Sequence, residues 1–96
     1  MARKYGRVDR NQNEIVEALR RIGCSVAVTS GVGVGFPDLV VGYRGANYLI
    51  EIKDGSKPPS EQKLTPDQQD FKALWRGQYA VVNTPEKAID YILSKS

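Results

Sequence analysis

The sequence predicts one α/β domain with the element order αβββαβα, in which helices flank a mixed sheet. Three observations lead to this prediction. Apolar residues recur at helical spacing in three segments, each beginning or ending at a recognisable helix boundary. Four shorter segments are rich in β-branched residues, as strands are. Finally, 96 residues with 41% apolar content suffice for a single hydrophobic core.

The first helix is predicted over residues 11–22, followed by a glycine that ends it. Residues 25–29 are predicted to form a strand, with Val26 and Val28 on one face. The apolar stripe of the helix consists of Ile15, Ala18, Leu19 and Ile22.

A hairpin is predicted next, with strands at residues 39–43 and 48–53 joined by a turn over residues 44–47. The glycine-rich connection before it, residues 31–35, is interpreted either as a turn with positive φ angles or as a loop that a DNA backbone can approach. Residues 54–64 contain two adjacent prolines and are predicted to form an exposed loop.

The second helix has a clear predicted start. Thr65 is the N-cap, Pro66 occupies the first helical position, and Gln68 closes a capping box. Gly77 is expected to end this helix. Its buried stripe is predicted to be Phe71, Leu74 and Trp75, and the two aromatic residues are interpreted as core rather than as a platform for stacking bases.

The chain is predicted to end in a strand over residues 79–83 and a helix that Thr84 caps, with Pro85 at its first position. The buried positions of this last helix are expected to be Ala88, Ile89, Ile92 and Leu93.

The composition excludes several classes of protein. There is no histidine, so no mechanism can use a histidine base or ligand. The single cysteine, Cys24, excludes an internal disulfide framework and is expected in the core, which suits a reducing compartment such as the cytoplasm. No signal peptide or membrane span is expected. The net charge of +3 is too small to indicate nucleic-acid binding by itself.

Three charged residues stand at unusual places in the predicted strands. Glu51 and Lys53 are two residues apart and therefore share a strand face, roughly 7 Å from each other. Asp38 precedes the neighbouring strand, so all three converge at one end of the hairpin. Taken separately, Glu51 and Lys53 could form an ordinary surface ion pair, and Asp38 could simply end a turn. Together they suit a divalent cation that acts on a phosphodiester.

Four motifs resemble the VRR-NUC domain, a branch of the PD-(D/E)xK nucleases with a restriction-endonuclease-like core. They are Glu14 in the first helix, the Gly-x-Pro-Asp of residues 35–38, the Ile-Glu-Ile-Lys of residues 50–53 and the Leu-Thr-Pro-x-Gln of residues 64–68. The resemblance covers residues 11–93 and is closest to minimal stand-alone copies such as those of bacteriophages, where the host-cell cytoplasm would be the location. Archaeal-type Holliday junction resolvases share the Pro-Asp and Glu-x-Lys pattern.

The resemblance implies a Mg²⁺ site, in which Mn²⁺ is expected to substitute. Asp38 and Glu51 would supply carboxylates and Ile52 its backbone carbonyl, which are the oxygen ligands that Mg²⁺ prefers. Glu14 would complete a second metal site or hold a water molecule on the metal. Lys53 would orient or deprotonate the attacking water, or stabilise the transition state. Gln68 would lie near Lys53, a role that is expected to compete with its place in the capping box.

The expected function is a structure-specific DNA endonuclease that resolves four-way junctions as a homodimer, in a single domain over residues 11–96 behind a basic arm of residues 1–10. Three alternatives stay open: a nuclease for flaps or single strands, a non-catalytic DNA-binding module, and an adaptor without metal. No membrane partner and no nucleotide cofactor are expected. The residues expected to contact phosphates are Arg3, Lys4, Arg7, Arg10, Arg44, Lys57 and Lys63.

Overall fold

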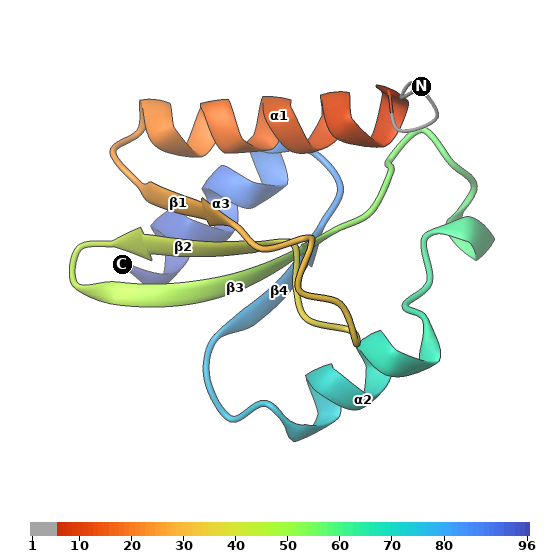
Figure 1. Cartoon of the computed structure of the whole chain (residues 1–96). Coiled ribbons are helices and arrows are strands. Elements are labelled where there is room, and N and C mark those ends of the chain that lie inside the picture. The colour runs from red at the N-terminus through yellow and green to blue at the C-terminus, as the bar shows by residue number, and fades with distance from the viewer. Residues whose placement is uncertain (1–5) are drawn as a thin grey trace.

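A computed structural model describes residues 6–96, with side chains for residues 10–96. It contains one four-stranded sheet in the order β1-β2-β3-β4, and three α-helices pack around it (Figure 1). The predicted α/β class and element order are confirmed. The elements are α1 (Gly6–Arg21), β1 (Ser25–Val28), β2 (Leu39–Tyr43), β3 (Ala46–Ile52), the 3₁₀ turn η2 (Pro59–Glu61), α2 (Pro66–Leu74), β4 (Tyr79–Val82) and α3 (Pro85–Lys95).

The sheet is mixed, as predicted. Strands β1, β2 and β3 are antiparallel neighbours, and β4 runs parallel to β3. The hairpin between β2 and β3 turns on only two residues, Arg44 and Gly45, which both have positive φ angles (51° and 82°). Two such residues match the twist of the flanking strands. Strand β3 therefore begins at Ala46, two residues earlier than predicted.

One face of the sheet carries the hydrophobic core beneath α1 and α3. The stripe predicted for α1 lies there, with Ile15, Ala18 and Leu19 buried and Ile22 packed at the edge. Cys24 is buried as predicted, and burial raises the pKa of its thiol. The other members of this core are Val16, Leu39, Val41, Tyr48, Ile50, Val82, Ala88 and Ile92.

The opposite face of the sheet belongs to α2. Because side chains alternate along a strand, Leu49 and Glu51 of β3 point away from the core that contains Tyr48 and Ile50. Figure 1 shows α2 on the far side of β3 and β4 from α1. This face therefore carries both the charged residues of β3 and the helix that contains Gln68.

The buried stripe predicted for α2 is wrong. Leu74 is 79% exposed, Trp75 is 43% exposed, and the helix has no fully buried residue. The physical reason is that α2 does not lie on the core. Instead Phe71 packs edge-on against Phe36, with ring centroids 5.3 Å apart, and stacks on Trp75 at the same distance.

Other differences concern boundaries and helix ends. α1 begins at Gly6, so residues 6–10 of the expected basic arm are helical, and residues 1–5 lie outside the described part of the chain. α2 ends at Leu74, three residues before the glycine expected to stop it. Val28 and Leu93, expected on apolar faces, are about half exposed and lie outside the hydrophobic core; Val28 is the last residue of the edge strand β1. None of the helices of residues 6–96 is long and apolar enough to span a bilayer.

Candidate metal centre

Asp38 and Glu51 form a pair of acids at one end of the hairpin. Leu39 pairs with Ile50 in the sheet, so the residue before β2 stands opposite Glu51. The Ile52 amide donates to Asp38 Oδ2 at 2.8 Å, which fixes the aspartate against β3. Glu51 is only 2% exposed. The sequence thus correctly predicted that these acids meet.

The surroundings of this pair favour a shared proton when no cation is present. Burial and, after it, the negative charge of Asp38 raise the pKa of Glu51 to about 8, and Lys53 acts against both effects. Burial also raises the pKa of Asp38, although the Ile52 amide, Glu51 and Lys53 act against it. Two carboxyl groups in contact cannot both ionise without repulsion, which a cation would relieve.

Lys53 and Gln68 complete a hydrogen-bonded network around Glu51. Gln68 Nε2 donates to Glu51 Oε2 at 3.0 Å, and Lys53 Nζ donates to Gln68 Oε1 at 2.7 Å. Lys53 Nζ also lies 3.7 Å from Glu51 Oε2. The predicted shared face of Glu51 and Lys53 is therefore confirmed.

The two roles expected to compete for Gln68 occur together. Its Oε1 accepts from the Thr65 amide at 2.9 Å while it accepts from Lys53, which is possible because an amide oxygen has two lone pairs. The Thr65 hydroxyl accepts in return from the Gln68 amide. The predicted capping box is confirmed, and it links the first turn of α2 to the acidic pair.

The acidic pair fits a hard divalent cation. Glu51 Oε1 is buried, and no hydrogen-bond donor of the described residues pairs with it. The Ile52 amide points toward Asp38, and the N–H and C=O of one strand residue point to the same side, so the Ile52 carbonyl faces this pair. Two carboxylates and one carbonyl suit Mg²⁺, which keeps several of its waters in proteins. The set lacks a third acid: among the described residues, no three His, Cys, Asp or Glu side chains lie close enough to hold one metal ion.

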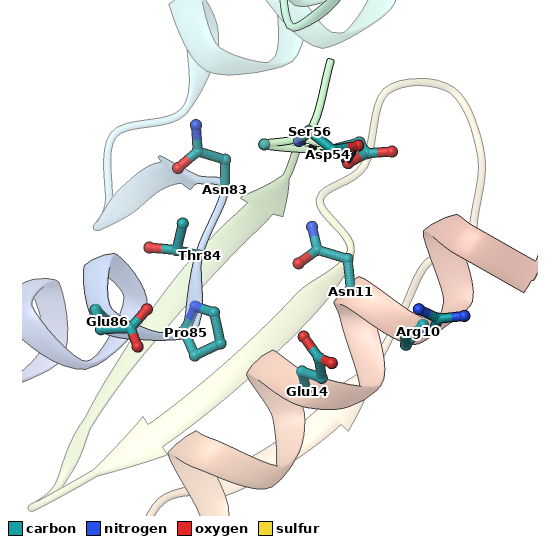
Figure 2. A pocket seen from close by; sticks show the side chains of 10 residues that line it. Arg10, Asn11, Glu14, Asp54, Ser56, Asn83, Thr84, Pro85 and Glu86 are labelled. Carbon is teal, nitrogen blue, oxygen red and sulfur yellow. Dashed lines mark hydrogen bonds between the residues drawn. The ribbon is translucent and has the colours of Figure 1, made fainter.

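Glu14 lies elsewhere than expected. It is an exposed residue of α1 and lines an open polar cavity of about 550 Å³ between α1, the end of β3 and the start of α3. Figure 2 shows it on the same side of α1 as Asn11. The structure does not bring it into one group of ligands with Asp38 and Glu51. The remaining lining residues are Arg10, Asp54, Gly55, Ser56, Asn83, Thr84, Pro85 and Glu86.

Two residues near the site escaped sequence reasoning. Asn11 Nδ2 donates to the Lys53 carbonyl at 3.0 Å and so ties α1 to the end of β3. Its position three residues before Glu14, on the same side of the helix, was the available signal. Tyr79 is the second: burial, Glu51 and Asp38 together raise the pKa of its phenol to about 12. Nothing around Tyr79 in the sequence predicts this position, because it depends on which strand lies next to β3.

The predicted phosphate-contacting residues are spread over the molecule. Arg44 stacks on the Tyr43 ring at the far end of the hairpin from the acidic pair. Lys57 pairs with Glu61 at 3.8 Å, and Lys63 is exposed in the same loop. Arg10 is exposed at the polar cavity. The side chains of Arg3, Lys4 and Arg7 lie outside the described residues.

Comparisons with known proteins support the resemblance in the sequence. The chain matches no family model and no curated protein. A solved structure named "VRR_NUC domain" resembles it with a TM-score of 0.68 and 26% sequence identity. The match covers 92% of this chain and 96% of that one, so the likeness extends over the whole fold and includes both sides of the sheet.

Proposed function

Because this chain has the fold of a VRR-NUC domain, we propose that it is a PD-(D/E)xK-type nuclease: a Mg²⁺-dependent DNA endonuclease that resolves four-way junctions as a homodimer. One observation carries the proposal. In the Asp38–Glu51 pair Glu51 is buried and Asp38 partly buried, Lys53 and Gln68 are hydrogen-bonded to each other beside it, and Glu51 Oε1 has no donor among the described residues. Burying two acids in contact destabilises a fold unless a cation compensates them.

Asp38, Glu51 and the Ile52 carbonyl are the groups that would hold the cation. When bound, Mg²⁺ lowers the pKa of a coordinated water and offsets the charge that develops on the phosphate. The Ile52 amide holds Asp38 in place for this task, and Gln68 holds Glu51 Oε2. Glu14 lines the adjoining cavity, so its proposed part is to position a water molecule rather than to bind the metal directly.

Lys53 is proposed to stabilise the transition state as an ammonium group. Its side chain is 14% exposed, donates to Gln68 Oε1 and lies 3.7 Å from Glu51 Oε2, so both contacts hold the amino group at the site. A lysine held in this way is well placed to stabilise a phosphate oxygen that gains negative charge. Gln68 keeps the ammonium group directed at the site.

The dimer is supported by apolar side chains that the single chain leaves uncovered. Val34 is 83% exposed, Val32 is 58% exposed, and both lie in the connection that leads to Asp38. Leu74 and Trp75 are exposed on α2. A second copy that covered these side chains would bury them, and two-fold symmetry would present two metal sites to the two-fold related strands of a junction.

A panel of labelled DNA substrates tests this proposal: a four-way junction, a flap, a linear duplex and a single strand, each with Mg²⁺, with Mn²⁺ and with EDTA. We expect paired, symmetric nicks in the junction that EDTA abolishes. Cleavage of flaps or single strands alone would keep the metal site and reject junction resolution. DNA binding without cleavage of any substrate would favour a non-catalytic module.

A further inference from the structure

Tyr79 carries a buried hydroxyl group that no atom of residues 10–96 pairs with. Its oxygen is inaccessible to solvent and has no hydrogen-bond partner among the described residues. A buried donor without a partner costs free energy, so native proteins rarely keep one unless it has a use. Phenylalanine would fill the same space without this cost. The hydroxyl therefore calls for an explanation.

The sheet places this hydroxyl on the same face as Glu51. Tyr79 pairs with Leu49 in the parallel register of β3 and β4, and Glu51 pairs with Val81. Tyr79 is thus diagonal to Glu51, a separation of roughly 7–8 Å between backbones that an aromatic side chain can bridge. Its ring lies 6.1 Å from that of Phe71, which helps to fix its direction on this face.

Glu51 has the complementary deficiency. Its Oε2 is paired with Gln68 and Lys53, whereas its Oε1 is buried and has no donor in the described part of the chain. An unpaired donor and an unpaired acceptor thus occupy one small region of the same sheet face. Both Glu51 and Asp38 act electrostatically on the Tyr79 phenol, which agrees with the short separation that the register implies.

We propose that Tyr79 is a positioning residue of the metal centre, whose hydroxyl donates a hydrogen bond to the Glu51 carboxylate when that carboxylate holds a cation. This inference rests on the proposed function. A hydrogen bond from outside the ligand set fixes the orientation of a ligating carboxylate and strengthens metal binding. The buried hydroxyl does not reach the substrate, so Tyr79 acts only through Glu51.

The test is Tyr79→Phe, which removes the hydroxyl and keeps the ring against Phe71. Tyr43→Phe is the matched control, because Tyr43 is a half-buried strand residue at the other end of the hairpin. Mn²⁺ binding to the full chain is measured by calorimetry, together with the metal-free melting temperature. We expect Tyr79→Phe to weaken Mn²⁺ binding about 10- to 100-fold without lowering the metal-free melting temperature. The control should bind Mn²⁺ as the wild type does.

The outcomes separate this inference from the proposed function. Unchanged Mn²⁺ affinity in Tyr79→Phe would overturn the role of Tyr79, and so would a loss of affinity matched by a loss of metal-free stability. If the wild type binds Mn²⁺ but cleaves no DNA, nuclease function fails and Tyr79 is still judged on affinity. If the wild type binds no Mn²⁺, both proposals fall.

Discussion

Titration of Glu51 should dominate the pH dependence of the stability of the metal-free protein. The pKa of Glu51 is raised from its ordinary value of 4.5 to about 8 in the folded chain. At a pH between these two values, the carboxyl group keeps its proton in the folded chain and loses it in the unfolded chain. Stability must therefore fall as the pH rises from about 5 to about 8. The loss is on the order of a few kcal/mol, because each pKa unit corresponds to about 1.4 kcal/mol.

Glu51→Gln tests this prediction, because it removes the titrating group and keeps the shape of the side chain. In EDTA, the decline of the unfolding free energy between pH 5 and pH 8 should become much shallower in this variant. Glu17→Gln is the control, since Glu17 lies on the surface of α1 and makes only an exposed ion pair with Arg21. Equal slopes in the wild type and Glu51→Gln would contradict the prediction.

At the residue scale, alternation along a strand was enough to predict the contact between Glu51 and Lys53, and the register of a short hairpin was enough to add Asp38. Tyr79 could not be predicted in this way. Its nearness to Glu51 depends on β4 lying beside β3 in parallel, a pairing between strands separated by a loop and a helix. Glu14 was expected at the metal by resemblance, and the orientation of α1 leaves it at the adjoining cavity.

The first turn of α2 couples a helix cap to the metal centre, because the oxygen of Gln68 serves both. Thr65→Ala should therefore cost about 1 kcal/mol of stability, as the loss of an N-cap does, and should also slow DNA cleavage. Thr84→Ala is a matched control, since Thr84 caps α3 through the Lys87 amide at 3.1 Å. Urea unfolding and single-turnover cleavage give the two readouts.

Thr65→Ala and Thr84→Ala should lose similar stability, but only Thr65→Ala should cleave more slowly. Thr65→Ser, which keeps a capping hydroxyl, should cleave at about the wild-type rate. Equal cleavage by the two alanine variants at matched folded fractions would mean that the cap and the site are independent.

The connection before β2 also depends on α2. Gly35 has a φ of 80°, and a Cβ there would collide with the Asp67 carbonyl. Gly33 has a similar φ of 87° but open space around it. Gly35→Ala should therefore lower the melting temperature more than Gly33→Ala, because both variants bear backbone strain and only one bears the collision. Equal losses would show that the connection is free to move away from α2.

At the element scale, features set by neighbouring residues were predicted correctly, and features set by tertiary packing were not. The caps at Thr65 and Thr84 were predicted correctly because capping depends on neighbours within four residues. The buried stripe of α2 was predicted wrongly because helical spacing of apolar residues does not reveal what the helix faces. Phe71 packs on Trp75, Phe36 and Tyr79 instead.

At the scale of the whole molecule, the two faces of the sheet are covered by different groups of residues. One face holds the core under α1 and α3, and the other holds the acidic pair beside α2. The element order was predictable because each element carries its own pattern. The arrangement that leaves α2 apart from the core was not, since it depends on contacts between distant segments.

The exposed apolar surface around α2 predicts how the chain assembles. Leu74→Lys should convert a dimer into a monomer, because it places a charge where a second copy would bury leucine. Leu93→Lys is the control, since Leu93 is also an exposed leucine (49%, against 79% for Leu74) but lies on α3, on the other side of the sheet. Light scattering after gel filtration gives the mass. A monomeric wild type, or equal behaviour of the two variants, would contradict this surface as the dimer interface.

The most direct measurement for the whole account is single-turnover cleavage of a labelled four-way junction in Mg²⁺, by the wild type, Asp38→Asn and Lys53→Met. Lys87→Met, an exposed change on α3, is the control. We expect each site variant to lose at least about 10²-fold in rate, the order found when one charge-stabilising group is removed from an active site. The control should cleave at the wild-type rate. Cleavage by folded Asp38→Asn at the wild-type rate would contradict a metal centre at this pair of acids.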